Sequence, residues 1–191
     1  LDVTKGCAYA DYLTWLDDKR RELIDGVGKL MSPAPKRIHQ EIQSHLFREI
    51  SWYLKGKKCK VFSAPFDVRL PKNGEKQDEK IFTIVQPDLS IICDRKKLDD
   101  RGCIGPPEMI VEITSPKTVD RDVNEKFTIY EQSGVKEYWI VYPHEQSISA
   151  FVLEGGKYQL KGMYAGKRQI KVHIFDELII NLEDIFEEPV D

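Results

Sequence analysis

The sequence has no long apolar run, no paired cysteine motif and no overall basic charge. No run approaches the roughly 18 apolar residues that would cross a membrane, and no basic-then-apolar signal segment stands near the start. We therefore expect a cytoplasmic protein. The 191 residues have a net charge of −3, with 41% hydrophobic and 32% charged residues, which is typical of a soluble globular chain. Any polyanion partner would have to bind a local basic patch.

Cysteine and histidine spacing excludes several classes of site. The four cysteines form no CxxC pair and have no histidine at zinc-finger distance. We expect reduced thiols rather than a disulfide framework. The histidines form no HExxH or HxH pair, Ser115 has no GxSxG context, and glycine-rich phosphate loops are absent. Zinc proteases, serine hydrolases and nucleotide-binding domains are set aside. The cysteines are Cys7, Cys59, Cys93 and Cys103.

Two short apolar strands each contain one acid. Asp88 lies in the run 85–92 and Glu112 in the run 109–116, 24 positions apart. An ionised carboxylate among Ile, Val and Leu is costly to desolvate unless a cation or hydrogen-bond donors receive it. Two such acids on neighbouring strands could converge on one divalent metal, as in a hydrolytic site. The alternatives are a turn or cap for Asp88, although Pro87 favours an edge or bulge there, and a salt bridge for Glu112.

The pattern along the chain predicts one α/β domain over 1–191, with helices flanking a mixed sheet. Asp25-Gly26 between apolar runs predicts a hairpin, and the unit of strand, helix and strand ending in 137–142 predicts parallel neighbours. Strands joined by loops should be antiparallel. The predicted helices are 9–16, 38–54 and 119–133 (ending at Gly134), with a short one after Asn181. The predicted strands are 62–70, 85–92, 109–116, 137–142 and a pair turning at Gly155-Gly156, and loops cover 71–80 and 94–107.

Lys126 is the candidate catalytic cation. It falls about 60° from the centre of the apolar face of the third helix, by 3.6 residues per turn, so its ammonium could reach over the sheet end toward the two acids. The alternative is a surface lysine that points outward. Lys117 is nearer in sequence but is expected in an open loop, and Arg121 is expected on the solvent side.

Two lysine- and arginine-rich clusters are candidate nucleic-acid contacts. A solvated surface is the alternative for each. The first consists of Lys55, Lys57, Lys58 and Lys60, and the second of Lys19, Arg20 and Arg21.

The motifs together resemble the PD-(D/E)xK nuclease superfamily and, more closely, the Uma-two (Uma2) family of restriction-type endonucleases. The resemblance covers about Tyr9 to Phe186. The segments that carry it are Glu22-Leu23-Ile24-Asp25-Gly26, Met31-Ser32-Pro33, His39-Gln40-Glu41-Ile42, Val85-Gln86-Pro87-Asp88-Leu89-Ser90, Val111-Glu112-Ile113, Ser115-Pro116, Glu125-Lys126 through Tyr130, and Gly134-Val135-Lys136-Glu137-Tyr138-Trp139-Ile140-Val141.

The resemblance implies a restriction-endonuclease-like fold with an α-β-β-β-α-β core, here with an extra N-terminal hairpin and C-terminal strands. It implies that Asp88, Glu112 and the backbone carbonyl of Ile113 ligate a metal. Glu22 matches an N-terminal acid of the pattern, in or beside the ligand shell. Mg²⁺ or Mn²⁺ suits such oxygen ligands.

Two positions depart from the pattern that the resemblance implies. Thr114 occupies the usual lysine position, and Lys126 from the following helix would replace that lysine. The strand that usually ends Val-Asp-Pro ends here as Val141-Tyr142-Pro143, so any role of that aspartate is lost.

The resemblance and the two buried acids together predict a metal-dependent endonuclease that cuts phosphodiester bonds. Double-stranded DNA is the expected substrate and a homodimer the expected assembly, since two-fold symmetry suits a duplex. One alternative is a nucleic-acid-binding relative that has lost catalysis. A carboxylate-pair hydrolase of sugars is a third class, disfavoured because no aromatic sugar platform is evident and Lys126 would have no role.

Overall fold

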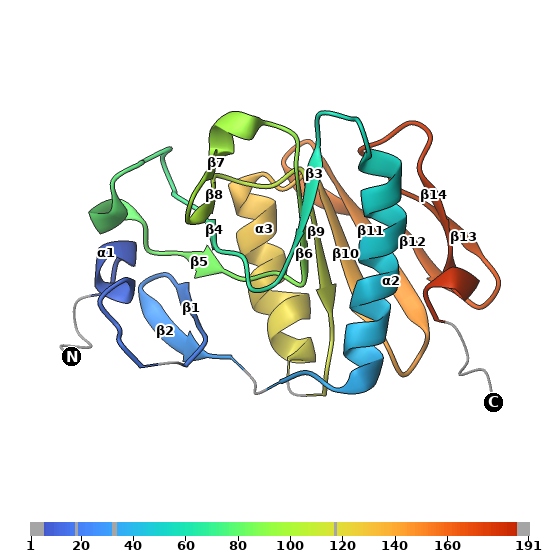
Figure 1. Cartoon of the computed structure of the whole chain (residues 1–191), viewed down its shortest axis with the longest axis horizontal. Helices are drawn as coiled ribbons and strands as arrows, with labels where there is room; N and C mark the ends of the chain where they lie inside the picture. Colours follow the sequence, from blue (N-terminus) through green and yellow to red (C-terminus); the bar gives the residue numbers. More distant parts are fainter. Residues whose placement is uncertain (1–5, 18, 32–33, 117, 187–191) are drawn as a thin grey trace.

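The computed structural model describes residues 6–17, 19–31, 34–116 and 118–186 (Figure 1). Its main sheet has the strand order β12-β11-β10-β9-β6-β3, and a second sheet has the order β2-β1-β5-β4-β8-β7. The helices are α1 (Tyr9–Tyr12), α2 (Arg37–Leu54), the π-helix η3 (Arg121–Lys126) and α3 (Phe127–Ser133), with 3₁₀ turns η1 (Asp78–Lys80), η2 (Arg95–Lys97) and η4 (Leu182–Asp184). The strands are β1 (Arg21–Ile24), β2 (Val27–Leu30), β3 (Lys60–Ser63), β4 (Val68–Arg69), β5 (Ile84–Val85), β6 (Leu89–Ile92), β7 (Leu98–Asp99), β8 (Gly102–Ile104), β9 (Met109–Ile113), β10 (Glu137–Tyr142), β11 (Ser147–Glu154), β12 (Lys157–Ala165), β13 (Gln169–Lys171) and β14 (Ile179–Asn181).

The core order α2-β3-β6-β9-α3-β10 is the predicted α-β-β-β-α-β order. β9 and β10 are parallel, as predicted for the crossover through the third helix. β6 and β9 are antiparallel with Leu89 opposite Val111. Continuing this register by one residue brings Asp88 opposite Glu112, at the same end of the sheet.

The two long helices cover opposite faces of the main sheet. Ile42, Leu46 and Ile50 recur every fourth residue along α2 and are buried against one face. On the other face Tyr130 of α3 packs against Tyr138 of β10, with ring centroids 5.1 Å apart. α3 ends at Gly134, whose φ of +88° is the predicted left-handed C-terminal conformation.

The second sheet brings the N-terminal hairpin to the main sheet. Asp25 and Gly26 have φ of +48° and +81°, which confirms the predicted tight turn between β1 and β2. β1 pairs with β5 through Leu23 and Ile84. Because β5 leads into β6, this pairing places Glu22 beside the start of the Asp88 strand.

Several predicted boundaries were wrong. The predicted strands 62–70 and 85–92 are each divided between the two sheets, because Pro65 and Pro87 cannot donate to a sheet ladder and the chain crosses from one sheet to the other beside them. The predicted loop 94–107 contains the β7–β8 hairpin, and β4 pairs with β8 in parallel rather than antiparallel. The first helix covers only Tyr9–Tyr12.

The expectation of four reduced thiols was also wrong. Cys59 and Cys93 form a disulfide, whereas Cys7 and Cys103 are free. In the β3–β6 ladder Lys60 pairs with Ile92, so the residues just beyond this pair lie opposite each other. The pairing depends on this tertiary register, and the sequence spacing gave no sign of it. None of the helices that the structure describes is long and apolar enough to cross a membrane.

Candidate active site

Glu112 is a buried acid that receives two donors from the third helix. The Lys126 ammonium donates to Glu112 Oε1 at 2.8 Å and the Tyr130 hydroxyl donates to the same oxygen at 2.6 Å. Burial raises the pKa of Glu112 to about 8, and the neighbouring carboxylates Asp122, Asp88 and Glu22 add to the rise against the opposing charge of Lys126. A cation bound beside Glu112 would therefore favour the ionised form of its carboxyl group.

Lys126 lies at the C-terminal end of the π-helix and is fully enclosed, with 1% of its surface exposed. Its ammonium is 2.8 Å from both Glu112 Oε1 and Glu22 Oε1, and 3.9 Å from Asp122 Oδ1. Burial alone would lower the pKa of Lys126, yet these carboxylates raise it above its usual value. The lysine points over the sheet as predicted, and not into solvent.

Glu22 comes from the hairpin and has no exposed surface. Its Oε1 accepts from the Lys126 ammonium and from the backbone N–H of Gln86 at 3.0 Å, while Arg121 lies 3.4 Å from Oε2. Burial opposes the charged form, but Lys126 and Arg121 outweigh it and lower the pKa of Glu22. Glu22 thus binds the cations of the π-helix.

Asp88 directly precedes β6, and its side chain accepts a hydrogen bond from the backbone of β9. Its Oδ2 accepts the N–H of Ile113 at 2.7 Å and lies 3.2 Å from His39 Nε2. Burial of the His39 ring alone would lower its pKa, but the Asp88 carboxylate and the Ile113 carbonyl outweigh this and raise it. One imidazole therefore faces two of the three predicted metal ligands. Gln43 also holds this turn, donating to the Asp88 carbonyl at 2.9 Å.

Asp122 is a further buried acid of the π-helix, one turn before Lys126. Burial raises its pKa to about 6, against the opposing charges of Lys126 and Arg121. Asp122, Arg121, His39 and Tyr130 were not among the predicted site residues. Arg121 was expected on the solvent side, which was wrong, because the wider π-helical turn rotates Arg121 toward Glu22.

These side chains line a cavity of about 400 Å³ at the sheet end. The cavity is lined by Asp88, Glu112 and Asp122 with Lys126, Arg121 and His39, and Glu22 lies behind Lys126. Arg20, Lys36 and His144 also line the cavity, so the four carboxylates meet four permanently charged cations and two histidines. The carboxylates of Asp88, Asp122 and Glu22 are gathered around Glu112 and raise its pKa, and such a cluster favours the binding of a cation beside it.

The donor set fits a hard divalent cation in part. Asp88 Oδ1 and Glu112 Oε2 accept no hydrogen bond from any residue that the structure describes, although their partner oxygens do. Two carboxylates and the Ile113 carbonyl are oxygen ligands of the kind that Mg²⁺ takes together with several waters. Within residues 6–17, 19–31, 34–116 and 118–186, no group of three or more His, Cys, Asp and Glu side chains is arranged to hold a metal by itself.

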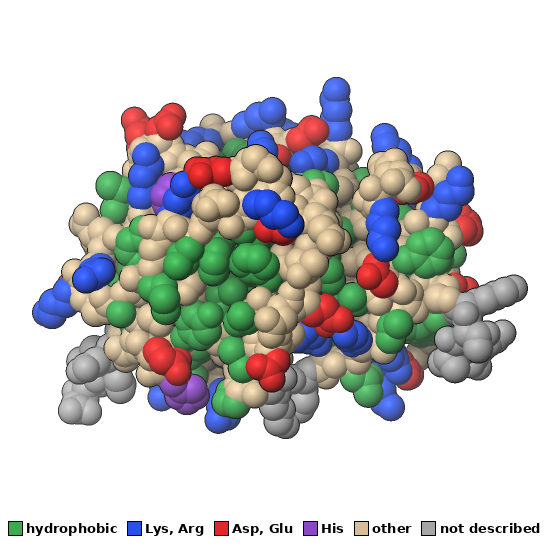
Figure 2. Space-filling model, turned by 180° about the vertical axis from the view of Figure 1, so that it is seen from behind, with side chains coloured by type: hydrophobic (Ala, Val, Ile, Leu, Met, Phe, Trp, Pro, Cys, Tyr) green, Lys and Arg blue, Asp and Glu red, His purple; other side chains and the backbone are tan. Residues whose placement is uncertain are grey.

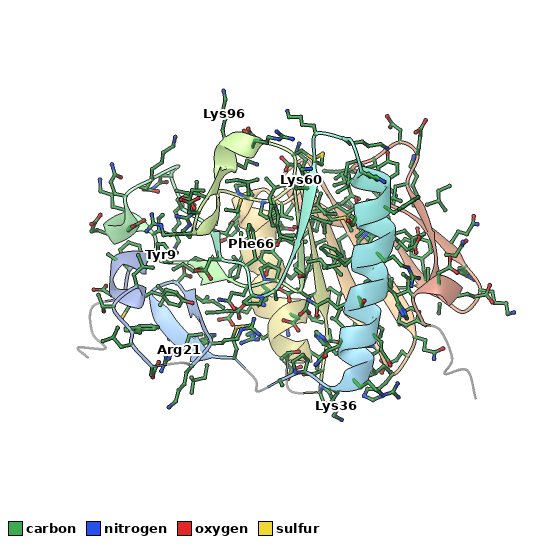
Figure 3. All side chains as sticks on the ribbon, in the orientation of Figure 1. Tyr9, Arg21, Lys36, Lys60, Phe66 and Lys96 are labelled. Atoms are coloured by element: carbon green, nitrogen blue, oxygen red, sulfur yellow. A yellow bond between two sulfur atoms is a disulfide. The ribbon has the colours of Figure 1, made fainter. Side chains whose placement is uncertain are left out.

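Thr114, at the usual lysine position, also lines this cavity, and its hydroxyl donates to the Val141 carbonyl at 3.0 Å. Other predicted residues lie away from the cavity or outside the described chain. The lysines at 55, 57, 58 and 60 are exposed and lie at the opposite end of α2 from His39. In Figure 3, Lys36 marks the start of α2 and Lys60 lies beyond its end. Lys117, Ser32 and Pro33 lie outside the described residues.

Comparison with known proteins gives a family and similar solved structures. Residues 9–183 match the model of the Uma2 family, described as "Putative restriction endonuclease". The crystal structure of a protein from Anabaena variabilis, described as "a putative nuclease belonging to DUF820", superposes with a TM-score of 0.73 at 18% identity, over 94% of this chain and 97% of that one. At this identity the likeness shows the fold. No curated protein matches the chain.

Proposed function

Because the chain belongs to the Uma2 family of restriction-type endonucleases, we propose that it hydrolyses phosphodiester bonds of nucleic acid, and of DNA in particular, with a divalent metal. The observation that carries the proposal is the junction of Asp88 and Glu112. The Asp88 carboxylate is bonded to the N–H that follows Glu112, so both acids line one cavity at the sheet end. A buried and a partly buried carboxylate that line one cavity repel each other, and a bound cation would relieve that repulsion.

Asp88, Glu112 and the Ile113 carbonyl would hold Mg²⁺ or Mn²⁺. The chemistry that such a cation supplies when bound is activation of water and neutralisation of charge on the phosphate. Glu22 would stand beside this set, since its contacts to Lys126 and Arg121 suit a positioning residue better than a direct ligand.

Lys126 would act on the reacting phosphate. Its ammonium is fixed by two carboxylates and lines the cavity, so the remaining N–H would stabilise a developing negative oxygen or orient a water. Tyr130 holds the other side of Glu112 Oε1 and leaves Oε2 for the cavity. We propose that the protein acts as a homodimer, which would place two such sites on one nucleic-acid substrate.

The alternative is a relative of the same fold that binds nucleic acid without cutting it. The observation that favours it is the pairing of Lys126 with both Glu22 and Glu112, which neutralises much of the site without any metal. Under this alternative the cavity would remain a binding surface only.

Cleavage of supercoiled plasmid and of labelled single- and double-stranded oligonucleotides, with Mg²⁺ or Mn²⁺ and with EDTA, tests the proposal. We expect cleavage in either metal and none in EDTA. Binding without cleavage in both metals would support the alternative, and equal cleavage in EDTA would contradict metal dependence.

A further inference from the structure

A groove runs from the candidate active site along α2. The cavity at Asp88 shares Arg20, Pro35 and His39 with a second cavity of about 430 Å³ beside α2. This second cavity shares Phe47 with a third, of about 760 Å³, at the C-terminal end of the helix. The three cavities therefore adjoin one another along α2, and together they are called the groove. Lys36, which lines the first cavity, and Lys60, which lines the third, lie near opposite ends of α2 in Figure 3.

One stripe of α2 and the edge of the main sheet form the walls of the groove. The stripe recurs every three or four residues beside the apolar stripe that faces the core. β3 is the edge strand of the main sheet and supplies Lys60 and Val61 to the same lining. From His39 to Lys55 the groove spans about 24 Å at 1.5 Å per residue. The stripe consists of Gln40, Gln43, Ser44, Phe47, Ser51 and Lys55.

The chemistry of the walls changes along the groove. Near the active site the lining combines the charged side chains of Arg20 and Asp88 with amide and hydroxyl side chains of α2 that can bond to base edges. At the far end Lys55 and Lys60 supply positive charge, and Trp52 is 75% exposed with the Lys55 ammonium 5.3 Å from its ring centre. The Glu49 carboxylate there is already bonded to Arg48. Of the four lysines in the cluster, Lys55 and Lys60 line the groove.

We propose that this groove binds one strand of nucleic acid and leads it to the Asp88–Glu112 site. The proposal rests on the proposed function and replaces the duplex expected from the sequence with a single strand as the substrate. An exposed tryptophan next to lysines is the arrangement that stacks an unpaired base while binding the adjacent phosphates. A duplex keeps its base faces stacked inside, so Trp52 would find no partner there. The opposite face of the molecule shows hydrophobic side chains near its centre, with charges of both signs around them (Figure 2), and suits a polyanion less well.

Binding without catalysis tests the groove separately from the nuclease proposal. The measurement is fluorescence anisotropy of a labelled oligothymidylate of about 12 nucleotides, within the range of known single-strand sites, in EDTA. A duplex of the same length is the comparison. We expect the single strand to bind more tightly than the duplex. Trp52→Ala should weaken its binding about 5- to 150-fold, the range for loss of one stacked base.

The salt dependence of binding measures the contribution of Lys55 and Lys60. Replacing Lys55 and Lys60 together by alanine should reduce the slope of log affinity against log salt by about 1.4, at about 0.7 per single-strand phosphate contact. Lys96→Ala and Phe82→Ala, which change exposed residues away from the groove, are the matched controls and should bind as the wild type does. Lys96 points away from the groove in Figure 3.

Each outcome is decisive. Tighter binding of the duplex, or unchanged binding by Trp52→Ala, would overturn the groove proposal even if the protein cuts DNA. Strand binding that depends on Trp52 in a protein that never cuts would support the groove and overturn the nuclease proposal. A concentration-dependent dimer that Trp52→Ala dissociates, without strand binding, would assign the groove to a second copy of the chain and overturn the proposal.

Discussion

The Lys126 ammonium lies 2.8 Å from Glu112 Oε1 and, at the same distance on its other side, from Glu22 Oε1. It thereby joins the sheet strand β9 to the N-terminal hairpin. All three side chains are almost fully enclosed. A buried charge of this kind is stable only while its partners remain. The effect of a substitution on stability therefore depends on which partner it removes.

Replacing Lys126 by methionine leaves Glu22, Glu112 and Asp122 without their shared cation. We expect a loss of about 3–5 kcal/mol in the free energy of unfolding, the usual cost of one missing partner in a buried ion pair, and a loss of cleavage of about 100- to 1000-fold, with metal binding retained. Urea unfolding, cleavage assays and Mn²⁺ binding measure the three effects.

A second variant separates folding from catalysis. Lys126→Met combined with Glu22→Gln removes one of the repelling charges and should regain stability without regaining cleavage. Lys117→Met, at a position outside the described residues, should be nearly silent. Wild-type cleavage by Lys126→Met would remove this lysine from the mechanism, and silence of Lys126 with loss at Lys117 would reverse the assignment.

The raised pKa values of Glu112 and Asp122, about 8 and 6, predict how stability depends on pH. Between about pH 4 and 8 the folded chain holds more protons on these acids than the unfolded chain, so the free energy of unfolding should fall as pH rises. The fall should be a few kcal/mol, at about 1.4 kcal/mol per pKa unit. Chemical unfolding in EDTA at pH 5 and 8.5 measures it. In Glu112→Gln the free energy of unfolding should fall less between these two pH values. Glu131 is an acid on α3 away from the cavity, and Glu131→Gln should show the same fall as the wild type.

His39 predicts a pH dependence of metal binding. Its pKa is raised by the bonds to Asp88 and to the Ile113 carbonyl, so below its pKa a positive imidazolium faces two proposed ligands. Metal affinity should therefore increase as pH rises above about 6.5, the ordinary histidine pKa. Mn²⁺ titration from pH 5.5 to 8 should show a shallower dependence for His39→Gln. An unchanged dependence in that variant would leave Glu112 as the titrating group.

The disulfide predicts a thiol count. Titration of thiols in denaturant should find two free thiols rather than four, since only Cys7 and Cys103 are unpaired. Replacing both Cys59 and Cys93 by serine should cost about 2–4 kcal/mol of stability, the usual range for a closed loop of this kind. A count of four would restore the sequence-based expectation of reduced thiols.

The local sequence pattern was enough to predict the helices, strands and turn that position the acids. The Asp25-Gly26 turn, the apolar stripe of α2 and the apolar run around Glu112 each express a periodicity that the fold retains. Lys126 points over the sheet as predicted, although the prediction assumed an α-helix and residues 121–126 form a π-helix. These features depend on neighbours within a few residues, and so a single sequence contains them.

Contacts between segments distant in the sequence could not be predicted from the local pattern. His39 meets Asp88 across 49 positions, and the Cys59–Cys93 pair depends on the register of β3 against β6. Arg121 was misplaced because the π-helix adds residues to its turn, and nothing in the residue types marks that widening. The prolines at 65 and 87 indicated breaks, but not that the chain changes sheets there.

The most direct test of the proposed metal site is the rate of metal-dependent cleavage by Asp88→Asn and Glu112→Gln. Each substitution keeps the shape of the side chain and removes one proposed ligand charge. Both should lose at least about 100-fold in rate, since even the residues that support metal ligands cost 10- to 100-fold, while Glu131→Gln should cut at the wild-type rate. Wild-type cleavage in Mg²⁺ or Mn²⁺ by either ligand variant would contradict the assignment of the active site.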